Sequence, residues 1–261
     1  MKAKPVLIFA CFILFYCLSS FYKLSGQAKL SINDLGYFEM PGFDVMVFDD
    51  YYPNGHQSGV TIVQNGVRVA ANGDVRFGLY PGKAAKKVDK AAGTIEVEIN
   101  YPDISFKYSV KVKAADRKII VTADLGSPLP ADLAGKAWFS MELFPAILFG
   151  KSWNMDNETG FFPTDSYGPF SGTDLLPYAS GKALTVAPED EAQRLTIKSL
   201  KGELQLVDGR MDRKASWFIV RTAIPPGQTK NVIEWEIEAN TVKDYLYKPV
   251  IHISQVGYLP N

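Results

Sequence analysis

The feature that most constrains this chain of 261 residues is an alternation of apolar and polar residues that recurs along most of its length. In the stretch TIEVEINY, Ile95, Val97 and Ile99 fall on one side of an extended backbone, and the polar residues between them fall on the other. The stretches SFKYSVKVK (105–113) and VIEWEIE (232–238) follow the same period. One face of each strand therefore meets a core and the other meets water, which is typical of antiparallel sheets.

Turn signals separate these alternating stretches. Asn65-Gly66 lies between VTIVQ and VRVAA, and Asn-Gly readily adopts the positive φ angles of a two-residue hairpin turn. Further corners are predicted at residues 72–73 (Asn-Gly) and 115–116 (Ala-Asp). Sustained helical periodicity is missing, and the pattern indicates roughly a dozen strands. We predict an all-β protein, an antiparallel two-sheet β-sandwich over residues 29–249 with a long aromatic-rich loop.

The segment from Gly150 to Gly181 departs from the alternation, because it is rich in glycine, proline and aromatic residues. A structureless loop of this length is uncommon in a compact domain and is usually either functional or wrongly assigned as a loop. Two interpretations stay open: the aromatic side chains fill a satellite core, or they form a platform that stacks on sugar rings. On the second interpretation the candidate glycan-contacting residues are Trp153, Asn154, Asp156, Phe162, Tyr167 and Phe170.

The N-terminus has the three parts of an export signal. Two lysines precede an apolar run, Pro5–Tyr22, and small residues follow it up to Ala28. We therefore expect residues 1–28 to be a signal peptide that is removed after Ala28, and the mature protein to be periplasmic, at the cell surface or secreted. Two alternatives stay open: the run is an uncleaved membrane anchor, or Cys17 carries a lipid.

Removal of the signal would change the inventory of reactive and charged groups. Both cysteines lie within residues 1–28, so the mature chain would have no disulfide, thiolate metal site or cysteine nucleophile. Loss of Lys2, Lys4 and Lys23 leaves 25 basic against 28 acidic residues, a net charge of about −3. Such a surface gives no electrostatic reason to bind nucleic acid, whereas neutral partners such as sugars are compatible with it.

Catalytic motifs are missing from the sequence. It has no glycine-rich phosphate loop, no His-Glu-x-x-His helix and no Gly-x-Ser-x-Gly elbow, so we expect neither a cofactor nor a metal. The two histidines, His56 and His252, fall in a turn-rich loop and on a strand, where we expect them to face solvent. Acidic neighbours such as Asp49 and Asp50 do not make a working glycosidase pair on a strand, since adjacent side chains point to opposite faces.

The stretch VIHISQVGYLPN (250–261) resembles the first strand of the immunoglobulin-like module that precedes the catalytic barrel in family 9 glycoside hydrolases, the cellulase family. The match lies in SQVGY (254–258) and in Pro260. Upstream, stretches such as MELFPAILFGKSW (141–153) look like the β-domain that leads into that module in enzymes of Gram-negative polysaccharide degraders. The resemblance implies that residues 29–249 are an accessory domain and that residues 250–261 begin a truncated immunoglobulin-like module.

The resemblance brings no catalytic residue to this chain. The family's aspartate pair, in an Asp-Ala-Gly-Asp-like motif, and its distant glutamate lie in a helical barrel that has no counterpart in this sequence. The expected function is that of a non-catalytic accessory domain, structural or glycan-contacting, in an exported enzyme that acts on β-glucan-type plant polysaccharides. Its partners would be the following modules of that enzyme and the polysaccharide. The alternative is a free-standing exported carbohydrate-binding or adhesion protein.

Overall fold

The computed structural model describes residues 28–49, 59–76, 83–166, 168–171, 174–211 and 217–246. The expected signal peptide at 1–28 lies outside these ranges except for its last residue, and the expected module start at 250–261 lies outside them entirely. His56 and His252 also lie outside the described residues.

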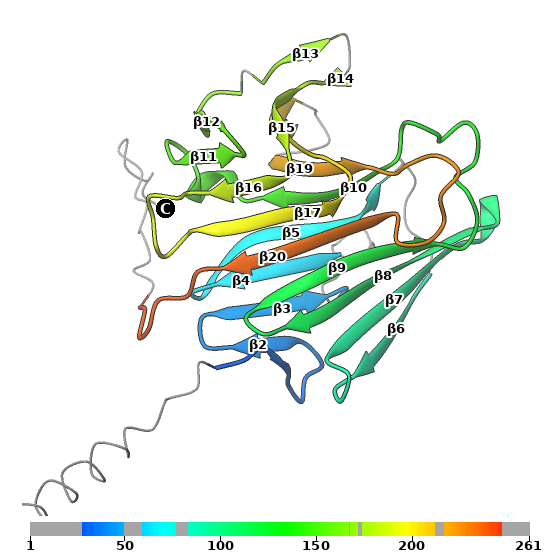
Figure 1. The fold of residues 1–261 in the computed structure, drawn as a ribbon, viewed down its shortest axis with the longest axis horizontal. Helices are drawn as coiled ribbons and strands as arrows, with labels where there is room; N and C mark the ends of the chain where they lie inside the picture. The colour runs from blue at the N-terminus through cyan, green and yellow to red at the C-terminus, as the bar shows by residue number, and fades with distance from the viewer. Residues whose placement is uncertain are drawn as a thin grey trace, which may run out of the picture.

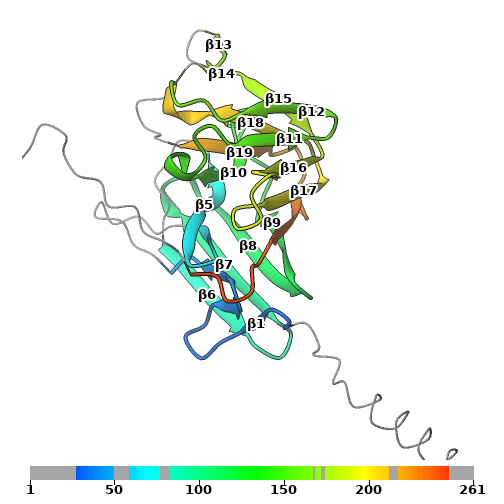
Figure 2. The ribbon, with the colours of Figure 1, turned by 90° about the vertical axis from the view of Figure 1, so that its left-hand side faces the viewer.

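The alternating sequence folds into two antiparallel sheets of nine strands each, which face one another as a β-sandwich (Figures 1 and 2). The predicted all-β, two-sheet class is therefore confirmed. Among the described residues the helical segments are three short 3-10 turns: η1 (Pro102–Ile104), η2 (Pro145–Ile147) and η3 (Gly209–Met211). None of the helices in this part of the chain is both long and apolar enough to cross a bilayer.

The spatial order of the strands in each sheet differs from their order along the chain. Across sheet A, the strands follow one another as β1 (Ser31–Ile32), β2 (Phe38–Met40), β3 (Phe43–Val47), β4 (Val60–Gln64), β5 (Val67–Arg76), β10 (Trp138–Leu143), β19 (Phe218–Ala223), β18 (Leu204–Asp208) and β15 (Pro177–Gly181). Across sheet B, they follow as β12 (Glu158–Phe161), β11 (Ser152–Met155), β16 (Ala183–Val186), β17 (Leu195–Lys201), β20 (Ile233–Ala239), β9 (Lys118–Leu125), β8 (Phe106–Ala115), β7 (Thr94–Tyr101) and β6 (Lys83–Asp89). A separate two-stranded ribbon consists of β13 (Phe170–Ser171) and β14 (Asp174–Leu175).

The core lies between the two sheets and is built from the inward-facing apolar residues. The apolar positions predicted in 94–101 are completely buried. At the centre, Trp235 of sheet B meets Phe139 of sheet A edge to face, with ring centres 4.9 Å apart. The indole Nε1 of Trp235 also donates to Thr222 Oγ1 (3.0 Å), so its polar atom is satisfied across the two sheets. Packing and hydrogen bonding together fix how the sheets face each other.

Two of the three predicted corners are confirmed. Asn65 (φ 49°) and Gly66 (φ 79°) form the turn between β4 and β5, where only residues that tolerate positive φ fit. Asp116 (φ 63°) lies in the turn between β8 and β9.

The third predicted corner, at Asn72-Gly73, is wrong, because both residues lie inside β5. Asn72 has φ 58°, and the pairing of β5 with β10 shifts register between Ser140 and Glu142, as in a β-bulge. A Cβ atom at Gly73 would lie 2.9 Å from Val60 Cβ and 3.2 Å from the backbone oxygen of Val60, so a side chain there would clash with the paired strand β4. The Asn-Gly pair forms a β-bulge within this strand rather than a turn that reverses the chain.

The tip of the β4–β5 hairpin is bound to loops of the opposite sheet. Gln64 Nε2 donates to the backbone oxygens of Arg194 (2.9 Å) and Asn240 (2.8 Å). Asn65 Nδ2 donates to the backbone oxygen of Ala192 (2.8 Å). The joined residues are between 127 and 176 positions apart in the sequence.

The segment 150–181, predicted as a loop, contains several short strands and lies at the upper end of the sandwich in Figure 1. β11 and β12 form a hairpin that extends sheet B, and β15 forms an edge of sheet A. These strands are two to five residues long, too short to show an alternation. For the same reason the described part of the chain contains twenty strands rather than a dozen.

Candidate functional site

Two of the predicted glycan-contacting residues, Trp153 and Phe162, lie in the core. Trp153 is 5% exposed, and its ring covers Gly160, its cross-strand partner in the β11–β12 hairpin. Phe162 is completely buried, with its ring centre 4.8 Å from that of Phe218. Neither ring presents a face to solvent, so both act as core residues.

The other candidates of this segment do not join them in one surface. Asn154 is half-buried on β11. Asp156 is exposed, but its carboxylate accepts hydrogen bonds from the backbone N–H groups of residues 182–183 (2.7 and 2.9 Å). Tyr167 and the side chain of Phe170 lie outside the described residues. Among the described residues, then, no aromatic platform is formed by the predicted set.

A different group of polar and aromatic side chains lies on the outer face of sheet A. The inward-pointing residues of β10 are completely or almost completely buried, so Trp138, Ser140 and Glu142 point outward. The strand register places Arg76 of β5 beside Trp138, and Arg221 of β19 beside Ser140. We call the following set the sheet A face: Asn72, Arg76, Trp138, Ser140, Glu142, Gln205 and Arg221.

Arg221 is the best-oriented cation of the sheet A face. Its guanidinium carbon lies 4.0 Å from the ring centre of Trp138, a cation–π contact. Its Nε donates to Gln205 Oε1 (3.1 Å), and its Nη2 donates to the backbone oxygen of Leu175 (2.9 Å). The guanidinium is thus held against the indole and oriented by two hydrogen bonds. Its Nη1 makes no hydrogen bond to any residue that the structure describes.

The two arginines of the face are not ion-paired by the residues that the structure describes. Within the described ranges, neither Arg221 nor Arg76 forms an ion pair. Burial lowers the pKa of Arg221, and the electrostatic influence of Asp174 on β14 opposes that shift. Partial burial of a cation without a counter-ion costs desolvation free energy. A binding role would explain why Arg221 is kept at this position.

Two carboxyl groups near the arginines have raised pKa values. Burial raises the pKa of Glu142, whose Oε2 accepts a hydrogen bond from Asn72 Nδ2 (2.7 Å). Burial also raises the pKa of Asp74 to about 6. The Oδ1 of Asp74 accepts a hydrogen bond from Tyr108 Oη (2.8 Å), which belongs to sheet B. The positive charge of Arg76 opposes both shifts.

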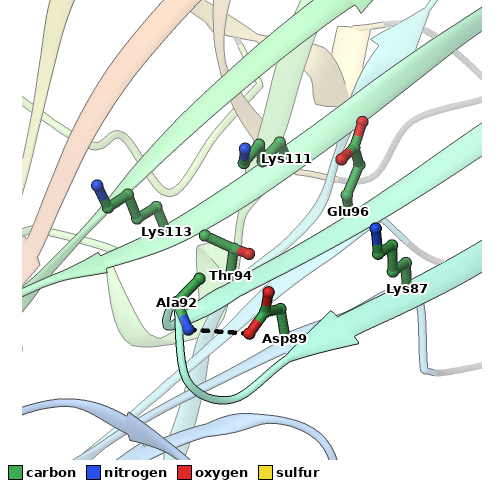
Figure 3. Close-up of a pocket in the computed structure, with 7 residues that line it drawn as sticks. All are labelled: Lys87, Asp89, Ala92, Thr94, Glu96, Lys111 and Lys113. Carbon is green, nitrogen blue, oxygen red and sulfur yellow. Dashed lines mark hydrogen bonds between the residues drawn. The ribbon is translucent and has the colours of Figure 1, made fainter.

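The outer face of sheet B offers a contrasting site, a depression of about 310 Å³ (Figure 3). Five of its seven lining residues are exposed, and none is aromatic. The hydrogen bond drawn in Figure 3 runs from Ala92 N to Asp89 Oδ1 (2.9 Å) and closes the β6–β7 turn. The lining residues are Lys87, Asp89, Ala92, Thr94, Glu96, Lys111 and Lys113. Charges of this kind are well solvated, so we assign no binding role to this depression.

The part of the chain that the structure describes contains no group of three or more His, Cys, Asp or Glu side chains that could hold a metal ion. No family model matches this chain, and no curated protein or solved structure does either. The residues of this chain are therefore the only basis for assigning the candidate site. Its one sequence signal is the stretch AWFSMELF, where Trp138, Ser140 and Glu142 alternate with apolar residues that fill the core.

Proposed function

We propose that residues 29–249 are an exported, non-catalytic accessory domain of a family 9 glycoside hydrolase, and that the sheet A face contacts the glycan. The catalytic modules of that enzyme would act on β-glucan-type plant polysaccharides. Support for the family comes from the SQVGY stretch at 254–258 and from the upstream resemblance. Support for export comes from the apolar run that ends before Ala28.

The observation that carries the glycan-contacting role is the arrangement around Trp138. A sugar ring has an apolar face that packs on an aromatic ring and hydroxyl groups that need donors and acceptors. Trp138 is half-buried, so part of its indole stays accessible. Ser140 and Glu142 follow Trp138 on the same face of β10, and Gln205 lies two strands away beside Arg221. Rigid strands hold these groups in place, as a preformed binding surface requires.

A second candidate function, hydrolysis of a glycan, is favoured by the raised pKa values of Glu142 and Asp74. Glycosidic bond cleavage needs two carboxyl groups, and perturbed pKa values are frequent at active sites. Asp74, however, is 4% exposed and is hydrogen-bonded to Tyr108. Because a buried carboxyl cannot reach a sugar, we favour the binding role.

The proposal is tested by titrating the purified protein with cellulose oligosaccharides, mixed-linkage glucan and xylan in a calorimeter. We expect binding that Trp138→Ala weakens at least tenfold, while Lys113→Ala on the outer face of sheet B leaves it unchanged. We also expect no release of reducing sugar from any of the three. Absence of binding to these glycans and to the acidic polymer tested below contradicts the glycan-contacting role, and sugar release that is lost in Glu142→Gln contradicts the non-catalytic one.

A further inference from the structure

We propose that the ligand of the sheet A face is an acidic glycan, and that Arg221 binds a carboxylate of a uronic acid unit. This inference rests on the proposed function only in taking this face as the glycan-contacting surface. It names a preferred ligand of the face, a polysaccharide that carries carboxylates, which should bind more tightly than the neutral glycans. It makes no change to the proposed substrate of the parent enzyme's catalytic modules.

The first argument is an internal comparison of two stacked arginines. Arg210 lies 4.3 Å from the ring centre of Phe218, much as Arg221 lies over Trp138. Arg210 also forms an ion pair with Asp208, whose side chain is completely buried, through Nη2 (2.8 Å). The fold thus supplies a carboxylate where a stacked arginine has a structural role. At Arg221 no described carboxylate lies within ion-pair distance, and Asp174 acts on it only electrostatically, which leaves the contact position for an anionic ligand.

The second argument is the geometry of the free donors on Arg221. A guanidinium has five N–H donors, and two of them are used by Gln205 and Leu175. The described residues leave both hydrogens of Nη1 and one of Nη2 without an acceptor. This pair of nitrogens forms the end of the guanidinium that binds a carboxylate through two parallel hydrogen bonds. Stacking on Trp138 fixes the plane of the group before a ligand arrives, so little side-chain entropy is lost on binding.

The third argument is the second cation on the same face. β5 and β19 flank β10, so Arg76 and Arg221 lie on strands about 10 Å apart, on either side of Trp138. Asp74 and Glu142 are both attracted electrostatically to Arg76, and this attraction partly offsets its positive charge. Arg221 is therefore the main carboxylate ligand, and Arg76 adds attraction for a chain that carries several carboxylates.

The decisive experiment compares two forms of one polymer, polygalacturonate and its fully methyl-esterified form, in which each charged carboxylate is replaced by a neutral methyl ester on the same backbone. We expect the protein to bind the acid form at least tenfold more tightly than the ester, with an affinity that falls as salt is raised. We expect Arg221→Gln to weaken binding of the acid form at least tenfold. Arg76→Gln should weaken it less, and Lys111→Gln on the outer face of sheet B should change it less than twofold.

The possible outcomes separate the two proposals. Equal binding of acid and ester overturns the inference and leaves the glycan-contacting role standing. Binding of neither polymer, together with no binding of neutral glucans, overturns both. Circular dichroism and melting temperature show whether Arg221→Gln is folded. If it is not, the acid-to-ester ratio of the unmodified protein decides alone, and a ratio near one refutes the inference.

Discussion

The outer faces of the two sheets arise from the same alternation but differ in how their charges are arranged. On sheet B, some charges are paired between neighbouring strands, as in Lys118 with Glu236 (2.7 Å) and Lys107 with Glu98 (3.2 Å), and lysines outside such pairs, such as Lys111, are exposed to solvent. On the sheet A face, Arg76 and Arg221 have no carboxylate partner among the described residues. Paired, hydrated charges keep a surface soluble at little cost. Half-buried and unpaired charges cost stability, which is why we assign the binding role to sheet A.

The largest expected effect separates two tryptophans, one in the core and one on the sheet A face. Trp153→Ala should lower the free energy of unfolding by about 3–5 kcal/mol, because it empties a buried site. Trp138→Ala should lower it by only about 1–2 kcal/mol, mainly through the lost contact with Arg221. Denaturant titrations of both variants measure the difference. Equal losses would mean that Trp138 is structural and that the two faces differ less than we infer.

The next effect concerns pH and the buried carboxyl beside the sheet A face. The pKa of Asp74 is about 6 in the folded protein, against an ordinary value of 3.8, so the folded state binds this proton more tightly. The contribution of Asp74 to stability is therefore greatest below pH 4. It falls as the pH rises from about 4 to about 6, by up to ~3 kcal/mol.

Asp74→Asn should flatten this part of the pH profile, since asparagine cannot ionise and its Oδ1 still accepts from Tyr108. Glu98→Gln, on the outer face of sheet B, should keep the decline because Asp74 is intact. Unfolding free energies at pH 4, 5, 6 and 7 give the comparison. Glu142 has a raised pKa as well, so a smaller decline should persist in Asp74→Asn. Parallel profiles for Asp74→Asn and the unmodified protein would refute the assignment.

The smallest effect belongs to the paired charges of sheet B. Lys118→Gln should lower the free energy of unfolding by about 0.2–1 kcal/mol, because the pair with Glu236 is partly hydrated. The loss should shrink at high salt, where the charges are screened. A double-mutant cycle with Glu236→Gln isolates the coupling between the two side chains. A coupling well above 1 kcal/mol would show that this ion pair contributes more to stability than an exposed surface pair does.

Much of the fold could be predicted from the sequence, because alternation and turn residues are local properties. The buried side of 94–101 and the turn at Asn65-Gly66 follow directly from neighbouring residues. The bulge at 72–73 could not be predicted, since the same Asn-Gly pair suits a turn or a bulge and only the close approach of Gly73 to Val60 of β4 distinguishes them.

The candidate site could not be predicted from the sequence, for a different reason. Arg76, Trp138, Gln205 and Arg221 come from four strands, and strand register alone brings them together. The predicted glycan-contacting residues were placed in the aromatic segment 150–181 instead. Its glycines and prolines are typical of loops, so the sequence does not reveal the short strands that bury Trp153. Composition shows where aromatic residues are, whereas burial depends on partners far along the chain.

The bonds at the tip of the β4–β5 hairpin also bear on the order in which the molecule assembles. Gln64 and Asn65 donate to backbone oxygens up to 176 positions away, just before β17 at Ala192 and just after β20 at Asn240. Closing such long stretches of chain carries an entropic cost that local hairpins avoid, so we expect these bonds to form late in folding. Bonds that form after the transition state slow unfolding without speeding folding, and we therefore expect the hairpin tip to affect mainly the unfolding rate.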